Sequence, residues 1–300
     1  MTYIHLIKRL FILPLTIIAA ALALVSCGSG ESSIEMPHIH GLGFSPDGRQ
    51  LIVPAHDGLR VFADGEWSVP EVPAHDYMGY TPVNDGFYSS GHPHPSSGLV
   101  NPFGLVRSTD GGQTLEELGF EGESDFHLMG VGYQNHAIFV LNLAPNSRLS
   151  AGLHYSLDDG QTWQPAAAEG VTARPFSLAV HPTEASVVAL ATEEGLFLSS
   201  DYGNSFARIG NAGPVTAVAF HPDGKTLLFG EGRLLAYDLA TEQTTEVPSP
   251  TIAADDAIGY IAVNPVENSE ISLATFNRDI YLSSDGGQSW SQLAKDGQAK

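Results

Sequence analysis

Histidines and aspartates gather at points of the sequence where short apolar segments begin or end. Seven of the twelve histidines stand there: His38, His40, His56, His75, His92, His94 and His127. Asp57, Asp76 and Asp125 lie beside or close to them in the chain. Neutral imidazole is the commonest metal ligand in proteins, and a neighbouring carboxylate orients the ring or completes the coordination. Nitrogen and oxygen donors together suit zinc or copper better than calcium, so this pool predicts a transition-metal site.

The same residue types allow three other functions. Two carboxylates at a suitable separation hydrolyse glycosidic bonds, and the candidates for such a pair are Asp57, Asp76, Asp125, Glu193 and Asp256. A purely binding site would use the imidazoles and carboxylates to hydrogen-bond a sugar or another small ligand. Its stacking faces would come from Tyr77, Tyr80, Phe87 and Tyr88. In the third alternative, an exposed rim recognises a protein partner and the chain is an assembly scaffold.

The elements that position these residues repeat along the chain. Each unit opens with a short apolar strand, such as His40–Phe44, and continues through a turn such as Ser45–Gly48 into a second strand. Turns with Pro-Asp-Gly or Asp-Gly are hairpin signals. Six such units fit the sequence, at residues 38–72, 73–121, 122–170, 171–211, 212–250 and 251–295. Units of about 40 residues with four strands each predict a β-propeller.

Four of the turns between third and fourth strands share the pattern Ser-x-Asp-x-Gly-x-Thr/Ser. Their aspartates are Asp110, Asp158, Asp201 and Asp285. An aspartate in a tight turn accepts backbone N–H groups, and the glycine permits a positive φ that a Cβ would oppose. The pattern therefore predicts that these four aspartates hold hairpins together and are not catalytic.

This repeat resembles the Asp box, or BNR repeat, of sialidases, sortilin-type receptors and photosystem assembly propellers. The resemblance implies an all-β protein, a single β-propeller over residues 37–296 with six four-stranded blades. The first and fifth units lack the box and carry Ala63–Trp67 and Tyr237–Glu242 in its place. In each blade the first strand begins, and the second strand ends, at the same rim of the central channel. We therefore expect the seven histidines, which belong to the first three blades, to converge at one mouth of the channel.

The last three blades offer other residue types at equivalent positions, namely Arg174, Thr192, Glu193, Glu194, Asp255, Asp256 and Asn277. A sialidase site needs a cluster of arginines for the substrate carboxylate, and only Arg174 falls at the predicted mouth. Typical sialidase activity is therefore not expected, and an enzyme of this kind would be another glycosidase-type hydrolase. Stretches such as His38–Gly43 and Ser124–Gly130 resemble a family of exported bacterial BNR-repeat lipoproteins. That family commonly carries a glycosylhydrolase label, but it supplies no motif for a catalytic pair.

The N-terminus predicts export. Lys8 and Arg9 precede an apolar run that ends in Leu24-Val25-Ser26-Cys27, which resembles the lipobox of bacterial lipoproteins. Residues 1–26 are thus expected to be a signal peptide, Cys27 the lipidated residue, and 27–36 a flexible tether on the extracytoplasmic side of a membrane. Cys27 is the only cysteine, so no disulfide forms within one chain. A net charge of −21 without any basic stripe argues against nucleic-acid partners.

Overall fold

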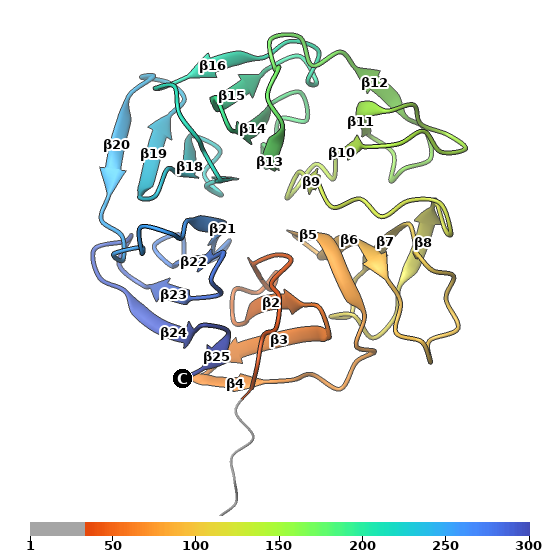
Figure 1. Ribbon diagram of the computed structural model, residues 1–300, viewed down its shortest axis with the longest axis horizontal. Coiled ribbons are helices and arrows are strands. Elements are labelled where there is room, and N and C mark those ends of the chain that lie inside the picture. The colour runs from red at the N-terminus through yellow and green to blue at the C-terminus, as the bar shows by residue number, and fades with distance from the viewer. Residues whose placement is uncertain (1–33) are drawn as a thin grey trace, which may run out of the picture. The chain divides into compact units, whose positions relative to one another are not determined.

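The computed structural model describes residues 34–300, and the expected signal peptide and Cys27 lie outside the described residues. These residues form six antiparallel sheets, which stand as blades around a central axis (Figure 1). The protein is an all-β, six-bladed propeller, as predicted. Among the described residues there is no helix long and apolar enough to cross a lipid bilayer.

Five of the sheets have four strands and the last has five. Blade one contains β1 (Gly43–Phe44), β2 (Leu51–Ala55), β3 (Gly58–Ala63) and β4 (Glu66–Ser68). Blade two contains β5 (Asp76–Val83), β6 (Gly86–His92), β7 (Leu105–Ser108) and β8 (Glu116–Gly119). Blade three contains β9 (Met129–Val131), β10 (Ile138–Asn142), β11 (Gly152–Ser156) and β12 (Gln164–Ala166).

The second half of the ring follows the same order. Blade four contains β13 (Pro175–Val180), β14 (Val188–Thr192), β15 (Gly195–Ser199) and β16 (Ala207–Ile209). Blade five contains β17 (Ala217–Phe220), β18 (Thr226–Gly230), β19 (Leu234–Asp238) and β20 (Thr244–Val247). Blade six contains β21 (Ile258–Val263), β22 (Ile271–Thr275), β23 (Ile280–Ser283), β24 (Ser291–Lys295) and β25 (Gln298–Ala299).

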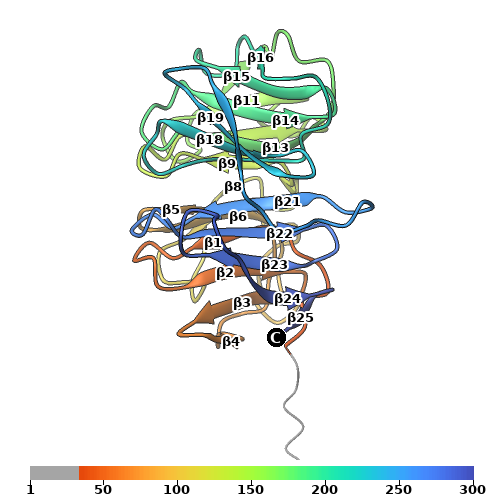
Figure 2. The ribbon, with the colours of Figure 1, turned by 90° about the vertical axis from the view of Figure 1, so that its left-hand side faces the viewer.

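The core of the propeller lies between the blades. Six apolar clusters each join residues of two neighbouring blades, and one of them closes the ring between blades six and one. The blades therefore stand face to face around the axis, which the side view shows as stacked sheets (Figure 2). Both faces of each sheet are covered, so second strands such as β2, β14 and β22 are buried along their whole length. This explains why they are nearly continuous apolar runs in the sequence.

The four Asp boxes form the turns between third and fourth strands. In the box of blade four, Ser199 Oγ donates to Asp201 Oδ1 at 2.8 Å and accepts from Gly203 N at 2.9 Å. The same carboxylate accepts from Ser205 N at 2.9 Å and from Ser205 Oγ at 2.7 Å. The other three boxes repeat this bonding. Each box aspartate thus has both oxygens engaged within its own hairpin.

The two ends of the described chain meet in the last blade. Ala299 N donates to Ile34 O at 2.9 Å, and Met36 N donates to Gly297 O at 2.7 Å. Glu35 pairs with Gln298 as an antiparallel bridge. Residues 34–36, which the sequence assigned to the tether, therefore belong to the ring. The ring also extends past the expected limit of 296, because β25 adds a fifth strand to blade six.

Candidate functional site

Blade one brings three histidines to one place at the mouth of the channel. The chain before β1 already runs antiparallel to the end of β2, because Ile39 bridges Ala55. His40 N donates to Pro54 O at 2.9 Å and His56 N donates to His38 O at 3.2 Å. Side chains alternate along an extended chain, so His38 and His40 share the face opposite Ile39. The rings of His38, His40 and His56 form a triangle with centroids 6.0–6.2 Å apart.

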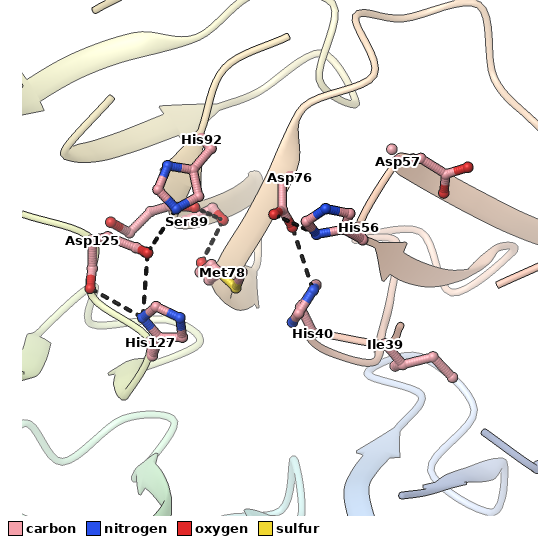
Figure 3. A network of polar contacts seen from close by, with 12 residues as sticks. Ile39, His40, His56, Asp57, Asp76, Met78, Ser89, His92, Asp125 and His127 are labelled. Atoms are coloured by element: carbon pink, nitrogen blue, oxygen red, sulfur yellow. Dashed lines mark hydrogen bonds and ion pairs between the residues drawn. The ribbon is translucent and has the colours of Figure 1, made fainter. Parts of the chain in front are cut away.

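Asp76, the first residue of β5, places its carboxylate beside two of these rings (Figure 3). His56 Nδ1 lies 2.7 Å from Asp76 Oδ2, and His40 Nε2 lies 3.4 Å from Asp76 Oδ1. Donor atoms of His40, His56 and Asp76 all lie within 4.8 Å of one another. We call these three residues the first trio. It joins blade one to blade two.

The first trio contains polar atoms that the protein itself leaves unsatisfied. His40 Nε2 and Asp76 Oδ1 are buried and face each other at 3.4 Å, and neither makes a hydrogen bond. A buried polar atom without a partner costs about 1–3 kcal/mol. Burial lowers the pKa of His40, and the two neighbouring imidazoles His56 and His38 act in the same direction, against the raising effect of Asp76. The net effect lowers the pKa of His40 and so favours the neutral imidazole, the form that binds a metal ion.

Close packing between blades one and two fixes the position of the first trio. A Cβ on Gly41, which follows His40, would lie 2.9 Å from Tyr80 Cβ, so only glycine allows this approach. Arg60, only 5% exposed, holds the turn that carries His56. Its Nε donates to Glu35 O at 2.9 Å, and its guanidinium pairs with Asp57 Oδ1 at 2.7 Å. Asp57 therefore supports this turn and does not face the rings, and Arg60 is a positioning residue that the sequence did not indicate.

A second group of the same residue types lies next to the first. Asp125 Oδ2 is 3.0 Å from His92 Nε2 and 3.4 Å from His127 Nδ1. We call His92, Asp125 and His127 the second trio; it joins blade two to blade three (Figure 3). Asp125 Oδ1 is buried without a hydrogen-bond partner. The segment around Asp125 is held by Ser90, whose Oγ accepts from Phe126 N at 2.9 Å and donates to Gly104 O at 2.6 Å.

Three histidines of the predicted pool lie outside both trios: His38, whose ring packs beside the first trio, and His75 and His94. His75 is 2% exposed, and its ring packs edge-on against Tyr77 and Phe103. Its Nδ1 accepts a hydrogen bond from His94 N at 2.9 Å. Burial lowers the pKa of His75, and His94 adds to that effect. His94 itself is exposed, and its Nδ1 contacts Ser96 Oγ at 2.8 Å. Both residues therefore shape the loop after β6.

The prediction that aromatic rings offer stacking faces at the mouth was wrong for Tyr77, Phe87 and Tyr88, whereas Tyr80 lines the channel. Tyr77 and Tyr88 are fully buried, and Phe87 and Tyr80 are 2% and 7% exposed. Tyr88 donates its hydroxyl hydrogen to Asp159 of the neighbouring blade. Their strands are covered by blades on both sides, so these side chains pack into the clusters between blades, and Tyr80 alone among them also borders the channel.

The channel itself is a cavity of about 250 Å³ lined by the innermost strands of all six blades. His40 and His127, one from each trio, both line it. Blade four adds Phe176, which is 40% exposed. In blade six, Phe276 in the turn after β22 is 57% exposed. Asp256 Oδ1 accepts hydrogen bonds from Ala257 N and Asn277 N and so closes a turn. The mouth therefore has an imidazole-rich half in blades one to three.

No protein-family model matches the sequence, and no curated protein does either. Solved structures of similar fold include a GH74 xyloglucanase from Xanthomonas campestris, with 19% identity and a TM-score of 0.53 over 87% of this chain and 46% of that one. A GH74 enzyme from Niastella koreensis gives 16% identity and a TM-score of 0.57, covering 88% and 47% of the two chains. The extracellular domain of a putative hybrid two-component system from B. thetaiotaomicron gives 14% identity and a TM-score of 0.54. The match covers 90% of this chain and 35% of that one.

The present chain thus spans less than half the length of these three proteins. At such low identity the likeness concerns the propeller fold alone. It confirms the fold predicted from the repeats, whereas membership of the Asp-box lipoprotein family stays a prediction.

Proposed function

We propose that this propeller binds a divalent transition metal ion, zinc or copper, through the first trio of His40, His56 and Asp76. The observation that carries the proposal is a pair of buried metal-donor atoms, His40 Nε2 and Asp76 Oδ1, which face each other without a hydrogen bond and lie within reach of a second imidazole. A cation bound there satisfies both atoms at once. It also removes the desolvation cost that they carry in the free protein.

The donor set favours zinc or copper over calcium and magnesium. Two imidazole nitrogens and one carboxylate oxygen match the ligands that zinc takes in proteins, whereas calcium takes six to eight oxygens. Three imidazoles bound to one zinc ion at about 2.0–2.1 Å have ring centroids roughly 5 Å apart. The observed triangle of 6.0–6.2 Å reaches that spacing by small rotations of the side chains. We propose His38 as a fourth ligand that joins by such a rotation, because its ring adjoins the first trio although its nitrogens lie outside the 4.8 Å group.

Metal analysis of the full chain, produced without a histidine tag, tests this proposal directly. The metal-free protein is titrated with zinc and with copper, and its melting temperature is followed. At 100 times the dissociation constant, binding to the folded state adds about 2.7 kcal/mol, which raises the melting temperature by roughly 5–10 °C. A protein that binds neither ion and gains no thermal stability would overturn the proposal.

The control is a histidine–aspartate pair outside the mouth. His221 Nδ1 lies 3.1 Å from Asp223 Oδ2 in a turn of blade five, so it offers the same residue types without a second imidazole. We expect His221→Gln to bind metal as the wild type does. The double variant His40→Ala/His56→Ala is expected to lose the ion from the first trio.

A hydrolase that uses two carboxylates is the alternative that fits the likeness to glycoside hydrolases. At the site itself, however, Asp76 contacts His40 and His56, and Asp125 contacts His92 and His127. The carboxylates therefore face imidazoles rather than a shared substrate position. Turnover of a glycan panel by the wild type, lost in Asp76→Asn and in Asp125→Asn, would favour this alternative.

We further propose that the propeller is exported and anchored to a membrane by lipid on Cys27, and faces the extracytoplasmic side. The support is the N-terminal segment of basic residues, apolar run and Leu-Val-Ser-Cys ending. Incorporation of labelled palmitate into the wild type, and its loss in Cys27→Ala, tests the anchor. A protein partner that binds at the mouth would be captured in a pull-down by the wild type and lost when mouth residues are substituted.

A further inference from the structure

A serine and a buried histidine are in contact in blade three, outside both trios. His154 is the middle residue of β11 and only 4% exposed. Ser150 is exposed and stands four residues earlier, in the loop between β10 and β11. Ser150 Oγ lies 3.2 Å from His154 Nε2, and His154 Nδ1 lies 3.1 Å from Gly152 O. The imidazole thus contacts a hydroxyl with one nitrogen and a backbone carbonyl with the other.

The carbonyl contact fixes the tautomer of His154. A carbonyl oxygen can only accept a hydrogen bond, so Nδ1 carries the ring hydrogen and donates it to Gly152 O. In the neutral ring, Nε2 then has the lone pair and accepts the hydroxyl hydrogen of Ser150. The residues directly opposite His154 on β10 and β12 are Val140 and Pro165, which carry no charge. Nucleophilic serines have this arrangement, in which an imidazole accepts the hydroxyl proton and a third group orients the ring.

The loop that carries Ser150 is held by buried contacts. Asn142, the buried last residue of β10, donates from Nδ2 to Ser150 O at 2.9 Å and to Leu149 O at 3.3 Å. Leu149 belongs to the apolar cluster between blades two and three. Asn146 Oδ1 accepts from Leu149 N at 2.7 Å. The hydroxyl and the imidazole are therefore positioned for proton transfer before any substrate binds.

We propose that Ser150 is a nucleophile, activated by His154, that takes the acyl group of activated esters. Its Oγ forms a bond to the acyl carbon while the hydroxyl proton passes to His154 Nε2. The ester C–O bond breaks, and the leaving oxygen takes that proton from Nε2, which gives an acyl-serine and an alcohol. Because Ser150 lies on the exposed surface, the substrate must bring a good leaving group, as aryl esters do. This activity uses no residue of the first trio and is independent of the proposed function.

Acetyl transfer from p-nitrophenyl acetate tests the proposal in the untagged full-length protein. Release of nitrophenol is followed, and the acetylated residues are located by mass analysis of peptides. We expect acetylation of Ser150, with a rate at least about 100-fold lower in His154→Gln, because a general base contributes at least that much. Ser96 is an internal control. Its Oγ lies 2.8 Å from His94 Nδ1, but that nitrogen also accepts from Ser96 N, and the ring of His94 is exposed.

The pH dependence in the wild type gives a second test that does not require the buried histidine to be replaced. The rate at Ser150 should rise as an imidazole loses its proton and then reach a plateau. The rate at a serine without a base instead keeps rising about tenfold per pH unit. Acetylation of Ser150 no faster than that of Ser96, an unchanged rate in folded His154→Gln, or the lack of a plateau would overturn the proposal. Addition of a zinc chelator should leave the rate unchanged, and a loss of rate would also overturn it.

Discussion

Aspartates serve two different purposes in this propeller. In the Asp boxes, both carboxylate oxygens accept hydrogen bonds from the same hairpin, as Asp201 does from Ser199 and Ser205. At the mouth, Asp76 and Asp125 each keep one buried oxygen that accepts no hydrogen bond. The box carboxylates lie at the outer turns, whereas the mouth carboxylates come from the inner edges of blades two and three.

The difference teaches how to distinguish a structural aspartate from a binding one. A structural carboxylate is satisfied by residues two to four positions away, so it stabilises its turn and has no oxygen left for a ligand. A binding carboxylate is positioned by contacts from other blades and keeps an acceptor that only a ligand fills. The cost of that buried acceptor is borne in the free protein and removed when the ligand binds.

The largest effect is expected for a substitution of the mouth carboxylate Asp76. Asp76→Asn removes the charge that the two imidazoles share, and should weaken zinc affinity at the first trio by at least about 100-fold. The melting temperature of the metal-free protein should stay the same or rise, because a buried charge is replaced by a neutral amide. Isothermal titration calorimetry measures the affinity, and Asp201→Asn in a box should leave it unchanged. Wild-type affinity in Asp76→Asn would contradict the comparison.

A substitution within an Asp box should lower the stability of the fold and leave the zinc affinity unchanged. Ser199 is 2% exposed, and its Oγ donates to Asp201 and accepts from Gly203 N. Ser199→Ala leaves a buried N–H without an acceptor, and should lower the free energy of unfolding by about 1–3 kcal/mol. Urea denaturation of metal-free protein measures this loss, and zinc titration should give the wild-type affinity. A weaker affinity would mean that box and mouth are coupled.

The pKa values of the box aspartates extend this comparison to acidic pH. Hydrogen bonds from Ser205 and Ser289 lower the pKa of Asp201 and Asp285 to about 2, from an ordinary value of 3.8. A carboxyl group with a depressed pKa in the folded state stabilises the fold above its ordinary pKa. That stabilisation disappears as the pH falls towards the folded pKa. The box contribution should therefore be lost between about pH 4 and pH 2.

Urea denaturation of wild type and of Asp201→Asn/Asp285→Asn across this range checks the pH dependence. The variant lacks both titrating groups, so its stability should fall less steeply between pH 4 and pH 2. Parallel curves for the two proteins would show that the boxes make no such contribution.

The smallest effect is expected in the other half of the mouth. Glu193, between β14 and β15, is an exposed carboxylate at the position in blade four that corresponds to His56 and Asp57 in blade one. We expect Glu193→Gln to change zinc affinity by no more than about twofold, because the charge is solvated and screened. Zinc titration at physiological salt measures the change. A tenfold loss would extend the site across the channel.

The sequence was sufficient for the fold because the Asp box is local. Its bonds join residues within a few positions of one another, so a pattern such as Ser199-x-Asp201-x-Gly203 already contains the turn. The triangle of His38, His40 and His56 was also foreseeable, since antiparallel pairing places the start of one strand beside the end of the next. Both predictions needed only short stretches of chain.

The rest of the site depends on contacts that short stretches do not contain. His75, Asp76 and Tyr77 are consecutive, and strand alternation sends only Asp76 towards the rings of blade one. Whether His75 or Asp76 points towards the rings depends on packing between blades. From the sequence alone, polar His75 was therefore a candidate ligand. Arg60 reaches the backbone of Glu35, a residue that is placed by closure of the ring. The division of the histidines into two trios likewise depends on the pairing of Asp76 with His92.

The pairing of residues 34–36 with residues 297–299 has a consequence for engineering. Because the two ends of residues 34–300 lie side by side, a short linker between them would join these residues into a continuous loop. It could then be cut open again at an exposed turn, such as the Asp64-Gly65 hairpin of blade one, without removing a strand from any sheet. Circular permutants of this kind should retain the ring, and they would allow a reporter to be placed beside whichever blade is of interest.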